Sequence, residues 1–200
     1  GNLFSVARTI EHFNGRVEMA TTPEQVIVAD RLILPGVGAF GTVMNALRQY
    51  DLVSAVREFA KAGRPFLGIC VGMQVMMDYS EEFGSNDGLA LIPGAVLAIP
   101  KTKSDGTPHP VPHIGWSELQ EHDAGWEGTL FDGLGSQDAV YFVHSFAAAP
   151  DKQENILATC SYNGQPITAA IVRDNMTGCQ FHPEKSGPVG LKIIHNFMDM

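Results

Sequence analysis

The pattern with the clearest chemical potential is a cysteine between two glycines, Gly68 and Gly72. An apolar run ends at Ile69, Cys70 follows, and a helical pattern begins at Val71. This spacing is typical of a nucleophile elbow, where a strained turn between strand and helix lifts the nucleophile above the sheet. Glycines are needed because side chains there would collide with neighbouring backbone. A helix start also favours a thiolate and leaves the Val71 N–H available to a developing oxyanion.

A thiolate nucleophile needs a proton carrier, and His182 is the best candidate among the seven histidines. It ends a strand pattern, and Glu184 follows two residues later, beyond a proline. Residues two apart in extended chain face the same side, so we expect the Glu184 carboxylate to hold the imidazole. With Cys70 they make a complete set for acyl transfer. A zinc site is the competing use, but the sequence has no CxxC or HExxH pattern, and Cys179 and His182 would face opposite sides.

The composition is that of a folded protein with an acidic surface. The chain has 200 residues, of which 44% are hydrophobic and 18% charged, enough for one buried core. Lys and Arg number 13 against 22 Asp and Glu, and the net charge of −9 argues against nucleic acid or an anionic membrane as partner. Uncharged runs such as 32–46 contain Gly and Pro and are too broken to span a bilayer. Sparse cysteines and no visible signal peptide favour a cytoplasmic location, and the first residue, Gly1, indicates a start inside a longer chain.

The two halves of the chain predict different arrangements of secondary structure. In the first half, helices alternate with short strands, which is typical of a parallel sheet covered by helices. The helices expected there are 3–13, one starting at Thr22-Pro23, 41–50, 52–62 and 71–79, and the strands are 16–20, 32–34 and 65–69. The second half favours antiparallel strands joined by tight turns, followed by a helix from Pro188. Those strands are 95–99, 113–119, 139–147, 155–162, 167–172 and 176–181.

Several motifs together resemble a known enzyme family. GICVGMQ at 68–74 and HPEKS at 182–186 resemble the class I, triad-type glutamine amidotransferases. Within that class, the chain is similar to the glutaminase subunits of imidazole glycerol phosphate synthases of histidine biosynthesis, through GNLFSV at 1–6, LPGVGAFG at 34–41, PHIGW at 112–116 and YFVHSF at 141–146. The likeness covers nearly the whole chain and implies a single domain over residues 1–200. It implies a three-layer α/β fold, with a mostly parallel central sheet between helices and an antiparallel strand extension in the C-terminal half.

The resemblance also implies a role for individual residues. Cys70 would attack the side-chain amide of glutamine, His182 would pass the thiol proton to departing ammonia, and Glu184 would orient His182. The oxyanion hole would use the N–H of Val71 and an N–H from the loop that contains Val37 and Gly38, where glycines allow a peptide to flip between inactive and active forms. The substrate-binding positions implied are Gly36, Gln74, His144, Ser145 and Phe146. No cofactor and no metal are implied.

A partner is implied as well, because the chain has no room for a site that consumes ammonia. In the family, the glutaminase forms a heterodimer with a (β/α)8-barrel cyclase, which takes ammonia through an internal channel. The cyclase makes imidazole glycerol phosphate and an aminoimidazole carboxamide ribotide. This chain departs from the family pattern in starting at the GN segment, without the strand that normally precedes it, and in having Phe146 in place of a more usual Tyr.

Three alternatives stay open at the level of sequence. The glutaminase subunit of pyridoxal phosphate synthase shares the HPE pattern, but PHIGW and YFVHS are not expected in it. An elbow-type cysteine hydrolase or peptidase would share the nucleophile turn, although Gln74 and the HPEKS segment argue against it. A non-catalytic interaction module with the same fold is disfavoured by the intact set of Cys70, His182 and Glu184.

Overall fold

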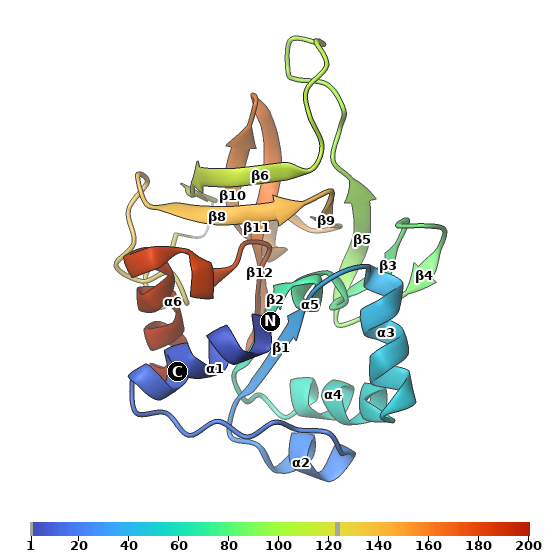
Figure 1. The fold of residues 1–200 in the computed structure, drawn as a ribbon, viewed down its shortest axis with the longest axis vertical. Coiled ribbons are helices and arrows are strands. Elements are labelled where there is room, and N and C mark those ends of the chain that lie inside the picture. The colour runs from blue at the N-terminus through green and yellow to red at the C-terminus, as the bar shows by residue number, and fades with distance from the viewer. Residues whose placement is uncertain (1, 123–124) are drawn as a thin grey trace.

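A computed structural model describes residues 2–122 and 125–200 as helices and strands around a central sheet (Figure 1). The helices are α1 (Asn2–His12), α2 (Pro23–Val28), α3 (Phe40–Gln49), α4 (Leu52–Lys61), α5 (Val71–Gln74) and α6 (Gly187–Asp199), with 3₁₀ turns η1 (Gln153–Asn155) and η2 (Pro183–Lys185). The strands are β1 (Leu32–Gly36), β2 (Phe66–Cys70), β3 (Met77–Ser80), β4 (Asn86–Asp87), β5 (Ile92–Ala98), β6 (His113–Glu118), β7 (Gln120–Glu121), β8 (Ala139–His144), β9 (Phe146–Pro150), β10 (Ile156–Tyr162), β11 (Gln165–Arg173) and β12 (Met176–Cys179). None of the helices described is both long and apolar enough to cross a membrane.

The central sheet brings the two halves of the chain to one edge. Its strand order is β1-β2-β12-β11-β10-β7. Strand β2 runs parallel to both neighbours, β1 and β12, whereas β11, β10 and β7 continue the sheet in antiparallel pairs. Parallel strands end at the same edge of a sheet, where α/β proteins place their ligands. Cys70 at the end of β2, the loop after Gly36 and the segment after Cys179 therefore meet there.

Two smaller sheets lie beside this edge of the central sheet. Strands β4, β3, β5 and β9 form one of them, and β6 pairs with β8 in the other. The chain passes from one sheet to the other at Ser145, between His144 at the end of β8 and Phe146 at the start of β9. In the β6–β8 pair, His113 lies directly opposite His144.

Helices cover the sheet in separate groups and enclose the core. Helix α1 packs against α6, while α2 and α3 both pack against α4 (Figure 1). A capping box starts α2, because the Thr22 hydroxyl accepts the Gln25 N–H and the Gln25 side chain accepts the Thr22 N–H. The core includes the fully buried rings of Phe40, Phe59, Phe66, Phe131, Phe142 and Phe181.

The α/β class and the antiparallel C-terminal extension are confirmed, and three expected elements differ. Residues 16–20 form no strand because, among the described residues, β1 has no second neighbour and no strand pairs with the backbone of this segment. The helix expected at 71–79 ends at Gln74, because the apolar run that follows pairs as β3 beside β5. The strand expected at 139–147 is divided at Ser145, since β8 and β9 belong to different sheets.

Candidate active site

The turn at Cys70 has the geometry expected of a nucleophile elbow. Its φ of 55° and ψ of −116° lie in a region that is strained for any residue with a Cβ, at a cost on the order of 1–3 kcal/mol. The flanking glycines permit the turn. A Cβ on Gly72 would overlap the Leu34 carbonyl oxygen, and one on Gly68 would lie 2.8 Å from both the Gly72 oxygen and the Met73 Cα. The residue types around Cys70 are therefore required by close backbone approach.

His182 and Glu184 form a buried pair beside this turn. The Nδ1 of His182 lies 2.9 Å from Glu184 Oε1, and the two side chains are 3% and 0% exposed. The imidazole also makes a side-chain hydrogen bond with Cys70. The pairing of His182 with Glu184 is present, but its geometry differs from the extended chain we expected, because Glu184 lies in the 3₁₀ turn η2. Pro183 starts this turn, which brings the carboxylate back to the Nδ1 of the imidazole.

The electrostatics of this row favour a charged imidazole. Burial alone would lower the pKa of His182, but the hydrogen bonds and the negative charges of Cys70 and Glu184 outweigh it and raise that pKa to about 9. His182 is therefore an imidazolium at neutral pH, next to the Cys70 sulfur and paired with the Glu184 carboxylate. This arrangement puts a proton carrier beside a candidate nucleophile, as an acyl-transfer reaction needs.

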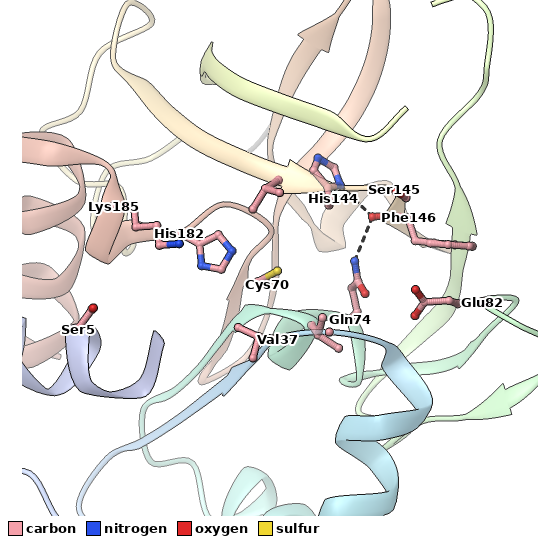
Figure 2. Close-up of a pocket in the computed structure, with 13 residues that line it drawn as sticks. Ser5, Val37, Cys70, Gln74, Glu82, His144, Ser145, Phe146, His182 and Lys185 are labelled. Carbon is pink, nitrogen blue, oxygen red and sulfur yellow. Dashed lines mark hydrogen bonds between the residues drawn. The ribbon is translucent and has the colours of Figure 1, made fainter. Parts of the chain in front are cut away.

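A cavity of about 570 Å³ opens over Cys70 (Figure 2). The predicted site residues that line it are Val37, Gly38, Cys70, Val71, Gln74, His144, Ser145, Phe146 and His182. Glu184 is not among the lining residues and lies behind His182. Gly36 is not among them either; a Cβ there would lie 2.6 Å from the Gly72 nitrogen. The fold thus gathers most of the predicted positions, from four separate stretches of chain, around Cys70.

Two polar residues near this cavity were missed by the sequence analysis. Glu82 lines the cavity, and its Oε2 accepts the Phe40 N–H at 2.7 Å. Gln180 is fully buried, and its Nε2 lies 3.9 Å from Cys70 Sγ. Gln180 follows β12 directly and stands two residues before His182, and in the strand that the sequence predicts over 176–181 this spacing could have revealed it. Glu82 comes from a loop after β3, for which the sequence offers no signal.

The remaining cysteines have no part in this site. Cys160 and Cys179 are buried free thiols, and burial raises the pKa of both, that of Cys160 to about 12. Within residues 2–122 and 125–200, no three His, Cys, Asp or Glu side chains converge in a way that could hold a metal ion. The described site offers a cysteine side chain with a histidine as its acid–base partner.

Comparison with known proteins agrees with this geometry. The family model "Glutamine amidotransferase class-I" matches residues 2–200, and the chain belongs to this family. Relatives include imidazole glycerol phosphate synthase subunit HisH 1 of Legionella pneumophila (strain Lens), which is 48% identical over all of this chain and 95% of the relative. Subunit HisH of Methanosarcina barkeri is 45% identical over all of this chain and 94% of the relative.

Solved structures support the fold. A crystal structure of a glutamine amidotransferase superposes with a TM-score of 0.73 over all of this chain and 93% of that chain, at 16% identity. The glutaminase domain of Trypanosoma brucei CTPS with bound acivicin gives a TM-score of 0.61 over 98% of this chain and 88% of that chain, at 15% identity. These matches at low identity show a shared α/β architecture.

Proposed function

We propose that this chain is the glutaminase subunit of an imidazole glycerol phosphate synthase. The Cys70 thiolate attacks the side-chain carbonyl carbon of glutamine and forms a tetrahedral oxyanion. As that intermediate collapses, the C–N bond breaks, His182 gives its proton to the departing nitrogen, and ammonia leaves. A γ-glutamyl thioester remains on Cys70. Water, deprotonated by His182, then attacks the thioester and releases glutamate, which regenerates the thiolate and the imidazolium.

The oxyanion is assigned to backbone donors around the nucleophile. The Val71 N–H follows Cys70 directly, and the loop with Val37 and Gly38 also lines the cavity. Gly38 has a φ of 86°, a conformation that glycine adopts without strain. A peptide flip at this loop would bring its N–H toward or away from the oxyanion, and such a flip would switch the activity on or off.

Charge in the cavity fits the two ends of an amino acid substrate. Glu82 is the carboxylate among the described lining residues, and it is placed to bind the α-ammonium group of glutamine. Gln74 uses its Nε2 on two acceptors, Phe146 O at 3.0 Å and Gln180 Oε1 at 2.9 Å, and so presents only its Oε1 to a substrate N–H. The backbone of Ser145 and Phe146 is assigned to the α-carboxylate.

An apolar surface beside the cavity supports a barrel-shaped cyclase as heterodimer partner. Ile114 and Trp116 on β6 are 58% and 57% exposed, and Val143 on β8, opposite Ile114, is 37% exposed. Val143 also lines the cavity, so the apolar face continues to its mouth. Contiguous exposed apolar residues of this kind are typical of protein interfaces. A partner docked here would receive ammonia before water protonates it, in the cytoplasm where histidine is made.

The observation that carries this proposal is the row of Cys70, His182 and Glu184, in which Cys70 and His182 line the cavity and Glu184 binds His182 from behind. Its test is glutamate release by the purified chain, alone and with the cyclase loaded with its nucleotide ligand. We expect low release alone, strong stimulation with both, and none for Cys70→Ala. Cys160→Ala is the matched control, because it removes a buried thiol outside the cavity. Undiminished glutamate release by Cys70→Ala would refute the assignment. Hydrolysis of peptides in place of glutamine would favour a peptidase.

A further inference from the structure

A buried glutamine lies against the nucleophile and has no part in the mechanism described above. Gln180 is fully buried, and its side-chain nitrogen lies 3.9 Å from Cys70 Sγ, within the range of an N–H···S contact. The sulfur also makes a hydrogen bond with the imidazole of His182, so Cys70 has two polar partners. A primary amide has a donor end and an acceptor end, and only its donor end would stabilise a thiolate. The orientation of the amide therefore decides whether it can stabilise the thiolate.

Gln74 holds the Gln180 amide in place. The carbonyl oxygen of Phe146 can only accept, so the Gln74 atom 3.0 Å away must be the amide nitrogen (Figure 2). That nitrogen also lies 2.9 Å from the nearer end of the Gln180 amide, which must then be its oxygen. The Gln180 nitrogen is thereby directed at Cys70 Sγ. A flipped Gln180 would place two NH₂ groups against each other in a buried site, which costs about 1–3 kcal/mol for the unsatisfied donor.

The Phe146 carbonyl is itself held by a pair of neutral histidines. His144 Nδ1 lies 2.8 Å from Phe146 O and must carry a proton to donate to it (Figure 2). His144 Nε2 then accepts from His113 Nδ1 at 3.0 Å, and His113 Nε2 accepts from the Ser117 hydroxyl at 3.0 Å. Burial lowers the pKa of His144 to about 3 and that of His113 to about 4, so both rings are neutral and their tautomers are set by this chain of bonds.

We propose that Gln180 is a positioning residue for the nucleophile, and that its amide N–H, aimed by Gln74, holds Cys70 Sγ in place and favours the thiolate. The inference rests on the proposed function, since it takes Cys70 as the attacking group. The amide adds a neutral donor to the sulfur besides the His182 imidazole. Hydrogen bonds to an ionised acceptor are stronger than those to a neutral one, so the thiolate gains more from this donor than the thiol does.

The test measures the sulfur directly, without glutamine. Iodoacetamide alkylation of Cys70 is followed by mass spectrometry across a pH range, in the full chain with the cyclase bound. Gln180→Leu keeps the approximate volume and removes the donor, and we expect about tenfold slower alkylation at neutral pH, with half-maximal rate moved to higher pH. In glutamine hydrolysis, kcat should fall more than KM rises. Thr177→Val is the matched control, because it removes a buried polar group from β12, away from the cavity, and should leave the alkylation profile unchanged.

The outcomes separate this inference from the proposed function. An unchanged rate and pH profile in Gln180→Leu overturns the inference, even if Cys70→Ala is inactive as the proposed function requires. If Gln180→Leu does not fold, Gln180→Met provides the same comparison with a flexible side chain that also lacks a donor. Gln180→Glu should slow alkylation further than either, because a carboxylate beside the sulfur opposes its ionisation. Faster alkylation in Gln180→Glu than in the unsubstituted chain would equally contradict the proposal.

Discussion

Replacing Glu184 with glutamine isolates what the buried carboxylate does for the imidazole. The Oε1 of Glu184 lies 2.9 Å from His182 Nδ1, and its side chain is fully buried. Its Oε2 has no hydrogen-bond partner among the described residues. Glu184→Gln keeps the shape, removes the charge and replaces one carboxylate oxygen with an NH₂ group. A hydrogen bond to a charged group contributes about 1.5–3 kcal/mol, so we expect a loss of about 2 kcal/mol in transition-state stabilisation, or about thirtyfold in rate.

The assay is glutamate release with the cyclase bound, measured as kcat/KM across pH. Besides the lower rate, the alkaline limb of the profile should move to lower pH, because part of what holds the pKa of His182 at about 9 is the charge of Glu184. Glu154→Gln is the control, since it makes the same chemical change in an exposed ion pair with Lys152 and should change nothing measurable. A Glu184→Gln enzyme with unchanged rate and unchanged alkaline limb would refute the reasoning.

Three further outcomes follow from the same structure. Gly72→Ala should destabilise the fold by at least about 1–3 kcal/mol in urea unfolding, because its Cβ would overlap the Leu34 carbonyl, whereas Gly135→Ala meets open space and should be nearly neutral. The pKa of His182 is raised in the folded state, so its contribution to stability is complete below about pH 6.5 and is lost as pH rises through about 9; both the urea midpoint and glutaminase activity should fall over that upper range. Thr22→Ala should lower the free energy of unfolding by about 1 kcal/mol, seen as a lower thermal midpoint, and leave glutaminase activity unchanged.

Some parts of the site were predictable because their signals are local. The elbow is written in the glycines around Cys70, since close backbone approach excludes any Cβ at those positions. The pairing of His182 with Glu184 depends on a two-residue spacing, and it survives although the connecting geometry is a 3₁₀ turn instead of extended chain. The same two-residue spacing could have identified Gln180, because it precedes His182 by two residues in the strand that the sequence predicts over 176–181.

Other parts had no local signal, and element boundaries show why. The apolar run Val75 to Met77 fits a helix or a buried strand equally well. Pairing with β5 decides that the chain continues as strand β3 from Met77. Residues 16–20 alternate as a strand should, but a strand exists only where a neighbour supplies its hydrogen bonds. Glu82 is an ordinary loop carboxylate until the fold brings it to the cavity.

Order along the chain was enough to predict the family, a candidate nucleophile, its candidate proton carrier and the α/β class, because each depends on short motifs or on the succession of local elements. Tertiary structure decided how these distant pieces act together. The parallel pairing of β1, β2 and β12 puts Cys70 beside His182, and the hydrogen bonds and charges gathered there raise the pKa of the imidazole against the effect of burial. The same packing orients the amides of Gln74 and Gln180 through partners far away in sequence. Hydrogen-bond direction and local dielectric are properties of the assembled interior, and no short stretch of residues contains them.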